Sequence, residues 1–214
     1  MSYDAVMAAT AADYAWVDEE DPAIFEAYCL TLARGLTAAE FLARLGTQPE
    51  APRTGISALC EPSYDVWADN ERRRDLQHLF IGATVVPGDG GDWALGVEIN
   101  GYLGVTRKAI IPLSASTRIV SHSRSVGAVD RFYWVEDGEI RLYFEPLFPD
   151  YREGSTPDAL VDVMREVGFD LQEDTEYEHP TEATFALAER LTGIRVTMDL
   201  LEESSYECGI ARVP

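Results

Sequence analysis

The sequence is nearly free of lysine and contains no long hydrophobic run. Lys108 is the one lysine among 17 basic residues. Such a bias is typical of a GC-rich coding sequence or of a salt-adapted proteome, so an acidic composition can belong to the source organism as well as to the function. No run of about 18 apolar residues is present, which excludes a membrane-spanning helix. Residues 1–21 lack the basic start and apolar core of a signal peptide, so we expect a cytoplasmic protein.

Cysteine is also scarce, and its spacing carries no recognisable chemistry. Cys29, Cys60 and Cys208 are far apart, with no C-x-x-C pair and no histidine close by. This excludes a compact zinc motif and predicts ordinary thiols in a reducing compartment. A nucleophilic cysteine would need a base, and the three histidines lie in unrelated local sequences. We therefore predict no metal, no cofactor and no catalytic residues, and we favour a protein that is not an enzyme.

Established catalytic and nucleotide-binding motifs are missing as well. No G-x-S-x-G elbow is present, and the glycines of PGDGGDW at 87–93 lack the lysine of a phosphate-binding loop. The acidic run at 173–179 lacks the glycine and spacing of a calcium loop and is predicted to be a solvated linker. Arg72 to Arg74 form the one basic cluster. It could grip a phosphate, but the flanking Glu71 and Asp75 favour ion pairing within the protein.

The charge that is present is strongly negative and uneven. The formal net charge is −21. Residues 1–70 carry 12 acids and 3 bases, residues 71–130 carry 6 and 7, and residues 131–214 carry 20 and 7. A chain this acidic is repelled by nucleic acid and by anionic membranes. We therefore predict no direct nucleic-acid partner, no membrane partner and, as the natural partner, a basic protein surface; the oligomeric state stays open.

The stretch DWALGVEINGYLG at 92–104 gives the clearest structural pattern. The bulky residues at 93, 95, 97 and 99 alternate with Ala94, Gly96 and Glu98, which predicts a strand with one apolar face. Further strands are expected at 28–34, 79–86, 118–125, 131–135 and 140–145, and helices at 10–19, after Thr37, near 108–116, after Thr156, at 182–191 and at 196–203.

These elements predict one α+β domain over residues 1–214. Short connections between the strands favour an antiparallel meander, so we expect a single antiparallel sheet of about five or six strands. Helices from both chain ends should cover one face of it. Prolines and a glycine make residues 47–78 a long irregular connection, and Pro146 and Pro149 should end the sheet.

Alternation along the strands also predicts a candidate ligand-binding or partner-binding site. If the strands line up, the polar face presents Glu98, His122, Arg124, Tyr143 and Glu145 on neighbouring strands. His122 is the group among them that ordinarily titrates near neutral pH. The alternative is an ordinary solvated face with cross-strand Arg–Glu pairs, because the register is not fixed by the sequence.

Several segments together resemble one known family. They are ADYAW at 12–16, CLTL to RGLT at 29–37, Trp93 with Glu98 and Asn100-Gly101, GS-x-P at 154–157, EVG at 166–168 and AERLTG at 188–193. In this order they are similar to an uncharacterised actinobacterial family that carries a domain of unknown function. The resemblance implies a domain type and a bacterial source, and it implies no chemistry. Residues 47–77 are not covered by it.

Two hypotheses from different classes follow. The first is a non-enzymatic, strongly acidic interaction protein that binds a basic protein partner, with an immunity-type or antagonist role as its sharper form. The second is a small-molecule-binding protein or enzyme that uses the polar sheet face around Glu98, His122 and Glu145.

Overall fold

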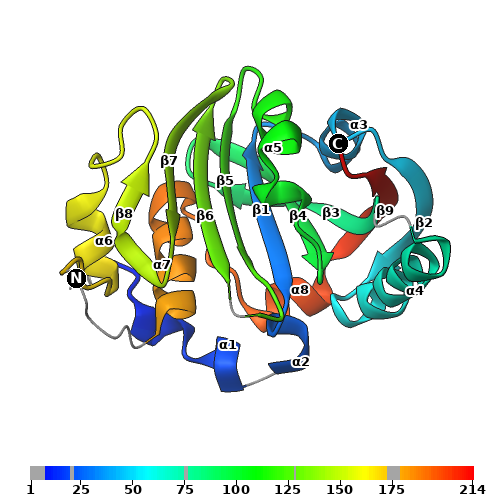
Figure 1. The fold of residues 1–214 in the computed structure, drawn as a ribbon, viewed down its shortest axis with the longest axis horizontal. Helices are drawn as coiled ribbons and strands as arrows, with labels where there is room; N and C mark the ends of the chain where they lie inside the picture. Colours follow the sequence, from blue (N-terminus) through cyan, green and yellow to red (C-terminus); the bar gives the residue numbers. More distant parts are fainter. Residues whose placement is uncertain (1–7, 20–21, 75–76, 128, 173–178) are drawn as a thin grey trace, which may run out of the picture.

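A nine-stranded antiparallel sheet organises the chain, as seen in a computed structural model (Figure 1). The structure describes residues 8–19, 22–74, 77–127, 129–172 and 179–214. The strand order is β2-β9-β3-β4-β1-β5-β6-β7-β8. Strands β3 and β4 form a hairpin and β5 to β8 a meander. Strand β1 is inserted between β4 and β5, and β9 between β2 and β3, so each of them pairs with strands far from it in sequence. The acidic run at 173–179 lies outside the described residues except for His179.

The strands are β1 (Tyr28–Arg34), β2 (Gln48–Thr54), β3 (His78–Gly88), β4 (Gly91–Ile99), β5 (Arg118–Arg124), β6 (Asp130–Glu136), β7 (Glu139–Glu145), β8 (Phe148–Glu153) and β9 (Ser205–Arg212). The α-helices are α1 (Trp16–Glu19), α2 (Pro22–Phe25), α3 (Ala38–Arg44), α4 (Ser57–Arg73), α5 (Arg107–Leu113), α6 (Val161–Val167), α7 (Pro180–Thr192) and α8 (Met198–Glu203). Two 3-10 helices, η1 (Ala11–Tyr14) and η2 (Leu103–Val105), complete the described elements.

Local sequence signals set several of these boundaries. The Thr37 hydroxyl accepts a hydrogen bond from the Glu40 amide while the Glu40 carboxylate accepts one from the Thr37 amide, so the predicted capping box begins α3. Thr197 caps α8 in the predicted way. Gly168 and Gly193 end α6 and α7, also as predicted.

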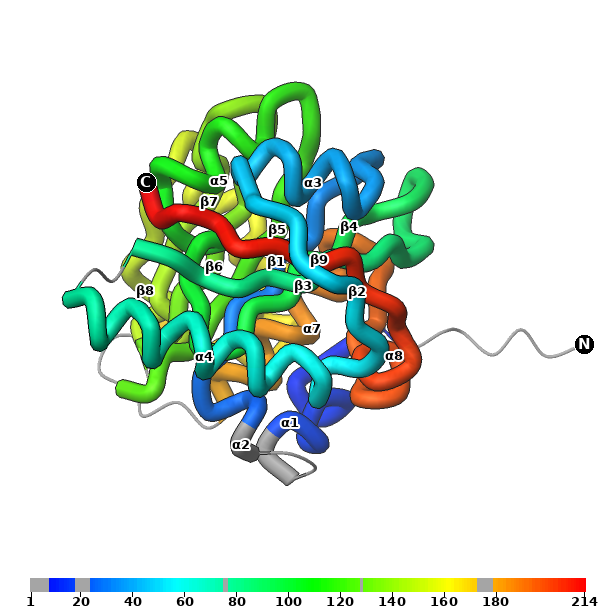
Figure 2. The backbone as a smooth tube through the Cα atoms, turned by 90° about the vertical axis from the view of Figure 1, so that its right-hand side faces the viewer, coloured from blue at the N-terminus to red at the C-terminus, as the bar shows by residue number. Residues whose placement is uncertain are grey.

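The sheet has an apolar layer on both of its faces. The alternation predicted for β4 is confirmed, because Trp93, Leu95, Val97 and Ile99 belong to one buried cluster and Ala94 to the other. The first cluster packs against α4, α7 and α8, and the second against α3 and α5. Figure 2 shows the two layers, with α3 and α5 above the strands and α4, α7 and α8 below them. The prediction that helices cover one face is therefore wrong.

The sheet is also larger than predicted. It has nine strands where five or six were expected, because β2, β8 and β9 were not recognised. The predicted irregular connection at 47–78 is wrong, since it contains β2, all of α4 and the first residue of β3. Tertiary packing explains α4. Leu59 is fully buried against Gly82 of β3, and this burial stabilises the helix although Pro62 lies inside it.

Prolines also lie in two of the strands that were not predicted, β2 and β8, and both of these are edge strands. Pro49 and Pro52 lie in β2, which is the edge strand beside β9 and is exposed along its whole length. Proline is tolerated at an edge because its missing N–H can face solvent. Pro149 lies in β8 at the opposite edge, so Pro146 and Pro149 do not end the sheet as predicted. In the part of the chain that the structure describes, no helix has the length and apolar character needed to cross a membrane.

Candidate functional site

The five predicted site residues lie at three separate places. Leu30 of β1 is paired with Val97 on one side and with His122 on the other, so His122 belongs to the apolar row of that face. Glu98 is paired with Cys29, in the neighbouring row, and its side chain lies on the opposite face. A shift of one residue in the pairing register moves every side chain of a strand to the other face of the sheet, and the sequence does not fix the register. The expected single polar face is therefore not formed.

Glu98 is enclosed beneath η2. Its side chain is 1% exposed, and its two oxygens accept hydrogen bonds from the backbone N–H groups of Leu103 at 2.9 Å and Gly104 at 3.0 Å. Burial raises the pKa of this carboxyl to about 7, although the two N–H groups act in the opposite direction. Through these two hydrogen bonds, Glu98 fixes the backbone of η2, which follows β4, against the sheet.

His122 and Arg124 face α7. The Nδ1 atom of His122 lies 3.1 Å from the Tyr28 hydroxyl, and its ring packs 4.6 Å from the ring of Phe185. Burial lowers the pKa of His122 to about 3, so the imidazole is neutral. Arg124 donates a hydrogen bond to the Thr181 hydroxyl at 3.4 Å. Both side chains join the sheet to the start of α7.

Tyr143 and Glu145 are the two predicted residues that the structure brings together at an open surface. They line a hollow of about 550 Å³ at the β7–β8 edge of the sheet. We call its lining the β8 surface, and it consists of Tyr143, Glu145, Phe148, Asp150, Tyr151 and Glu153. Figure 1 shows β8 at one end of the sheet, beside α6.

An irregularity in the β7–β8 pairing shapes this surface. Phe144 is paired with Arg152, but the next residue, Glu145, is paired with Phe148. Residues 149–151 of β8 therefore have no opposite residue in β7. A bulge of this kind bends an edge strand and changes the direction of its side chains. The result is an edge strand whose aromatic side chains point into solvent.

Two aromatic side chains of the β8 surface are unusually open. Phe148 is 58% exposed and Tyr151 is 73% exposed. Large exposed apolar groups at neighbouring positions are typical of binding surfaces when polar residues surround them. Tyr143, by contrast, is fixed, because its ring packs 4.6 Å from the ring of Tyr133. The surface thus has a rigid aromatic base and two accessible aromatic groups.

Arg107 of α5 holds one side of the β8 surface in place. Its guanidinium lies 5.4 Å from the centre of the Tyr143 ring and donates to Glu153 at 2.9 Å and to the Tyr133 hydroxyl at 3.4 Å. The hydrogen bonds to Tyr133 and Glu153 raise the pKa of Arg107. One cation therefore stacks on an aromatic ring and neutralises one of the three carboxylates.

The other two carboxylates are not neutralised in this way. Among the residues that the structure describes, neither Glu145 nor Asp150 has a basic side chain within ion-pair distance. Burial raises the pKa of the Tyr143 phenol, and the nearby Tyr133 and Glu145 raise it further, whereas a hydrogen bond and the positive charge of Arg131 act in the opposite direction. With three carboxylates beside Arg107 and Arg131, the β8 surface keeps an excess of negative charge, with a neutral phenol at its base. In the described part of the chain, no three or more histidine, cysteine, aspartate or glutamate side chains are grouped so that they could hold a metal ion.

Four residues of the β8 surface were missed by the sequence analysis. Phe148, Asp150, Tyr151 and Glu153 follow Pro146, which was interpreted as the end of the sheet. The short connection between Glu145 and Phe148 was the available signal, because a connection this short favours an antiparallel return.

Comparison with protein families places the chain in a group. The model of a family of unknown function (DUF6461) matches residues 7–214. The chain belongs to this family. The match covers nearly the whole sequence, including every element of the sheet, so the β8 surface lies within the family's domain. Neither the curated proteins nor the solved structures contain a match to the chain.

Proposed function

We propose that this protein is a non-enzymatic interaction protein and that its β8 surface binds a basic protein surface. An immunity-type or antagonist role is the specific form of this function. The observation that carries the proposal is the combination of the unpaired carboxylates of Glu145 and Asp150 with the exposed aromatic rings of Phe148 and Tyr151 at one edge of the sheet.

Charge complementarity supports a basic partner. The chain has a net charge of −21, and 20 of its 38 acidic residues lie in residues 131–214, which include β8. Long-range attraction of this size raises the rate at which an oppositely charged partner associates. Glu145 and Asp150 then supply unpaired carboxylates at the contact itself, and these suit the planar guanidinium of arginine.

Burial of the aromatic side chains of Phe148 and Tyr151 against a partner would supply most of the binding free energy. Exposed charges contribute little net free energy, whereas buried aromatic side chains are frequent anchors of protein interfaces. Phe148 and Tyr151 are already exposed, so a partner can cover them without rearranging the fold. Their rings also offer faces on which a lysine or arginine of the partner can stack.

A capture experiment with matched variants tests this function. Wild type, the charge variant E145Q/D150N and the aromatic variant F148A/Y151A are immobilised and exposed to a lysate of the source organism at physiological salt. The control is E61Q/D65N, which removes two exposed carboxylates from α4 near the other end of the sheet. We expect wild type and control to recover the same basic protein, and both β8 variants to lose it.

The purified pair then allows a direct measurement. The dissociation constant should rise by about tenfold or more in each β8 variant, and the association rate should fall with added salt. An antagonist role further requires that the partner lose its activity in the complex. Recovery of the same partner by all four proteins, or recovery of no basic protein by wild type, contradicts the proposal.

The second predicted function required Glu98, His122 and Glu145 to share one pocket. Glu98 and His122 instead lie on opposite faces of the sheet, both 1% exposed. We do not propose a function for that set.

A further inference from the structure

A second hollow, of about 380 Å³, lies between α3 and the β2 edge of the sheet, and we call it the α3 hollow. Its lining is mostly apolar and consists of Ala39, Leu42 and Ala43 of α3, Pro49, Glu50 and Pro52 of β2, Glu207 and Cys208 of β9, and Thr47. Figure 2 shows α3 above β9 and β2. This is the opposite edge of the sheet from the β8 surface.

The walls of the α3 hollow are fixed before a ligand enters. The rings of Pro49 and Pro52 hold the backbone of β2 at these positions. The turn between α3 and β2 is held by Thr47, whose backbone N–H and hydroxyl donate to the carbonyl oxygen of Leu42 at 3.2 Å and 3.1 Å. Gly209 of β9 lets this turn lie close, because a Cβ atom there would come within 2.7 Å of Thr47. A preformed apolar hollow binds a small molecule without the cost of ordering its walls.

Glu207 places a carboxylate on the side of the sheet that faces α3. It is paired with Ala83 of β3, which belongs to the same buried cluster as Leu42 of the helix. Two residues further along β9, Gly209 lies against Thr47 of the hollow. Side chains two residues apart on a strand share a face, so the Glu207 side chain is directed to the hollow. Its carboxylate is also open to solvent and to an entering ligand.

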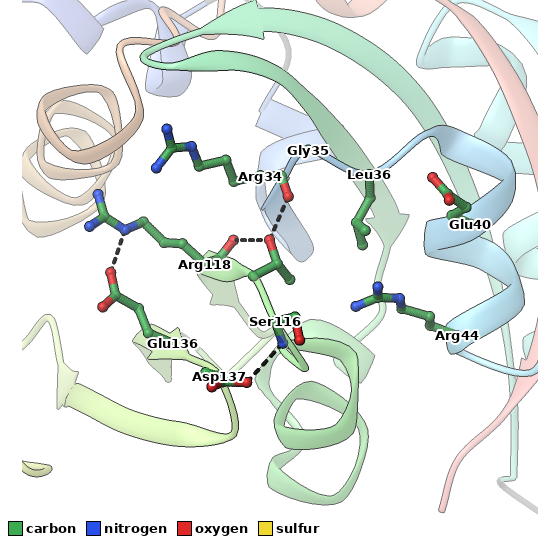
Figure 3. A pocket seen from close by; sticks show the side chains of 10 residues that line it. Arg34, Gly35, Leu36, Glu40, Arg44, Ser116, Arg118, Glu136 and Asp137 are labelled. Atoms are coloured by element: carbon green, nitrogen blue, oxygen red, sulfur yellow. Dashed lines mark hydrogen bonds and ion pairs between the residues drawn. The ribbon is translucent and has the colours of Figure 1, made fainter.

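No basic side chain lies within ion-pair distance of Glu207 among the residues that the structure describes. Arg53, the one basic residue of β2, is paired with Tyr206 and therefore belongs to the row that faces away from α3. Arg44 of α3 donates to backbone carbonyl oxygens in a separate hollow, which Figure 3 shows lined by Arg44 and Glu40. The negative charge of Glu207 therefore remains available to a ligand.

We infer that the α3 hollow binds a small organic cation, namely an alkylammonium or arylammonium ion. Its apolar body fills the hollow, and its ammonium group pairs with Glu207 at the rim. Burial of the hydrocarbon part against the apolar walls supplies most of the binding free energy, and the ion pair selects the charge.

The electrostatics of the α3 hollow disfavour the other classes of small ligand. Glu50 and Glu207 repel an anion, and the net charge of −21 increases this repulsion. A neutral molecule gains from the apolar walls but makes no ion pair with Glu207. A cation with an apolar body is the class that uses both features.

Three probes of equal chain length test the preference for a cation. Hexylammonium, hexanol and hexanoate are titrated separately into the protein at neutral pH and constant ionic strength, and the amide NMR shifts are recorded. We expect hexylammonium to bind saturably at millimolar concentrations and to shift the resonances of Thr47 and Glu207. Hexanol should bind about fivefold more weakly, and hexanoate should leave these resonances unchanged.

Substitutions then assign the binding to the α3 hollow. E207Q removes the charge and keeps the size of the side chain, so hexylammonium should bind it about fivefold more weakly, as hexanol binds wild type. A43L enlarges an exposed side chain of the lining and should weaken the binding of both hexylammonium and hexanol. The control E61Q removes an exposed carboxylate of α4 and should bind hexylammonium as wild type does. The melting temperature of each variant checks that the fold is intact.

Each of three results would overturn the inference. One is the absence of saturable binding of hexylammonium to wild type. Another is an equal dissociation constant for hexylammonium and hexanol, which would mean that the hollow does not recognise charge. The third is an E207Q protein that binds hexylammonium as tightly as E61Q does. The variant E145Q/D150N should bind hexylammonium normally, so the outcome is independent of the β8 surface.

Discussion

Glu98 accepts a hydrogen bond from the backbone N–H of Gly104 at 3.0 Å, and this contact ties the end of β4 to η2. Gly104 in turn lies directly against the side chains of Thr31 and Ser121, whose hydroxyl oxygens are 2.9 Å apart. A buried carboxylate and a glycine six residues later thus fix the path of the chain over the centre of the sheet. Two predictions follow from this pair of residues.

The stability of the protein should depend on the protonation of Glu98. Its pKa is raised from 4.5 to about 7 by burial, so its contribution to the free energy of unfolding is fully present below pH 4.5 and is lost as the pH rises through 7. The loss is about 3 kcal/mol if the shift is fully expressed. Denaturant unfolding of E98Q between pH 4.5 and 8 should lack this decline, whereas E61Q should follow wild type.

Gly104 should not tolerate a side chain. A Cβ atom there would overlap the Thr31 hydroxyl and come within 2.7 Å of the Ser121 hydroxyl. We expect G104A to lower the free energy of unfolding by about 3 kcal/mol, measured by urea denaturation. G127A is the matched control, because its Cβ would meet only the Ser125 hydroxyl at 3.8 Å. An equal effect of the two substitutions would contradict the close packing described above.

His122 should give the opposite dependence on pH. Burial lowers its pKa from 6.5 to about 3, so its contribution to stability is present above pH 6.5 and is lost as the pH falls toward 3. The loss is up to about 5 kcal/mol over that range. The difference in unfolding free energy between wild type and H122N should therefore shrink on acidification.

The capping box of α3 gives a test of local structure. Thr37 supplies the hydroxyl that accepts from the Glu40 amide at 3.2 Å. T37A should lower the free energy of unfolding by about 1 kcal/mol, while T37S, which keeps the hydroxyl, should be nearly neutral. Thermal or denaturant unfolding measures both. A T37A protein as stable as wild type would mean that packing of Phe41 and Leu42 alone holds this helix.

Local patterns were sufficient for the elements whose signals lie within a few residues. The alternation in β4 predicted which of its side chains share a face, and Thr37 with Glu40 predicted the start of α3. Long-range pairing was required for β9, which was missed because its partners β2 and β3 are more than 100 residues away in sequence. Strand β2 was missed for the same reason: it forms by pairing with the distant β9, and its exposed residues show no apolar periodicity.

The sequence by itself determined the strong negative charge, the mixed α+β composition and the apolar face of β4. The tertiary structure decided which polar residues meet. The register of β1 between β4 and β5 placed Glu98 and His122 on opposite faces, and the bulge in β8 brought Tyr143 and Glu145 together with Phe148 and Tyr151. The physical reason is that side chains alternate along a strand, so a face is known only once the partner and the register are known.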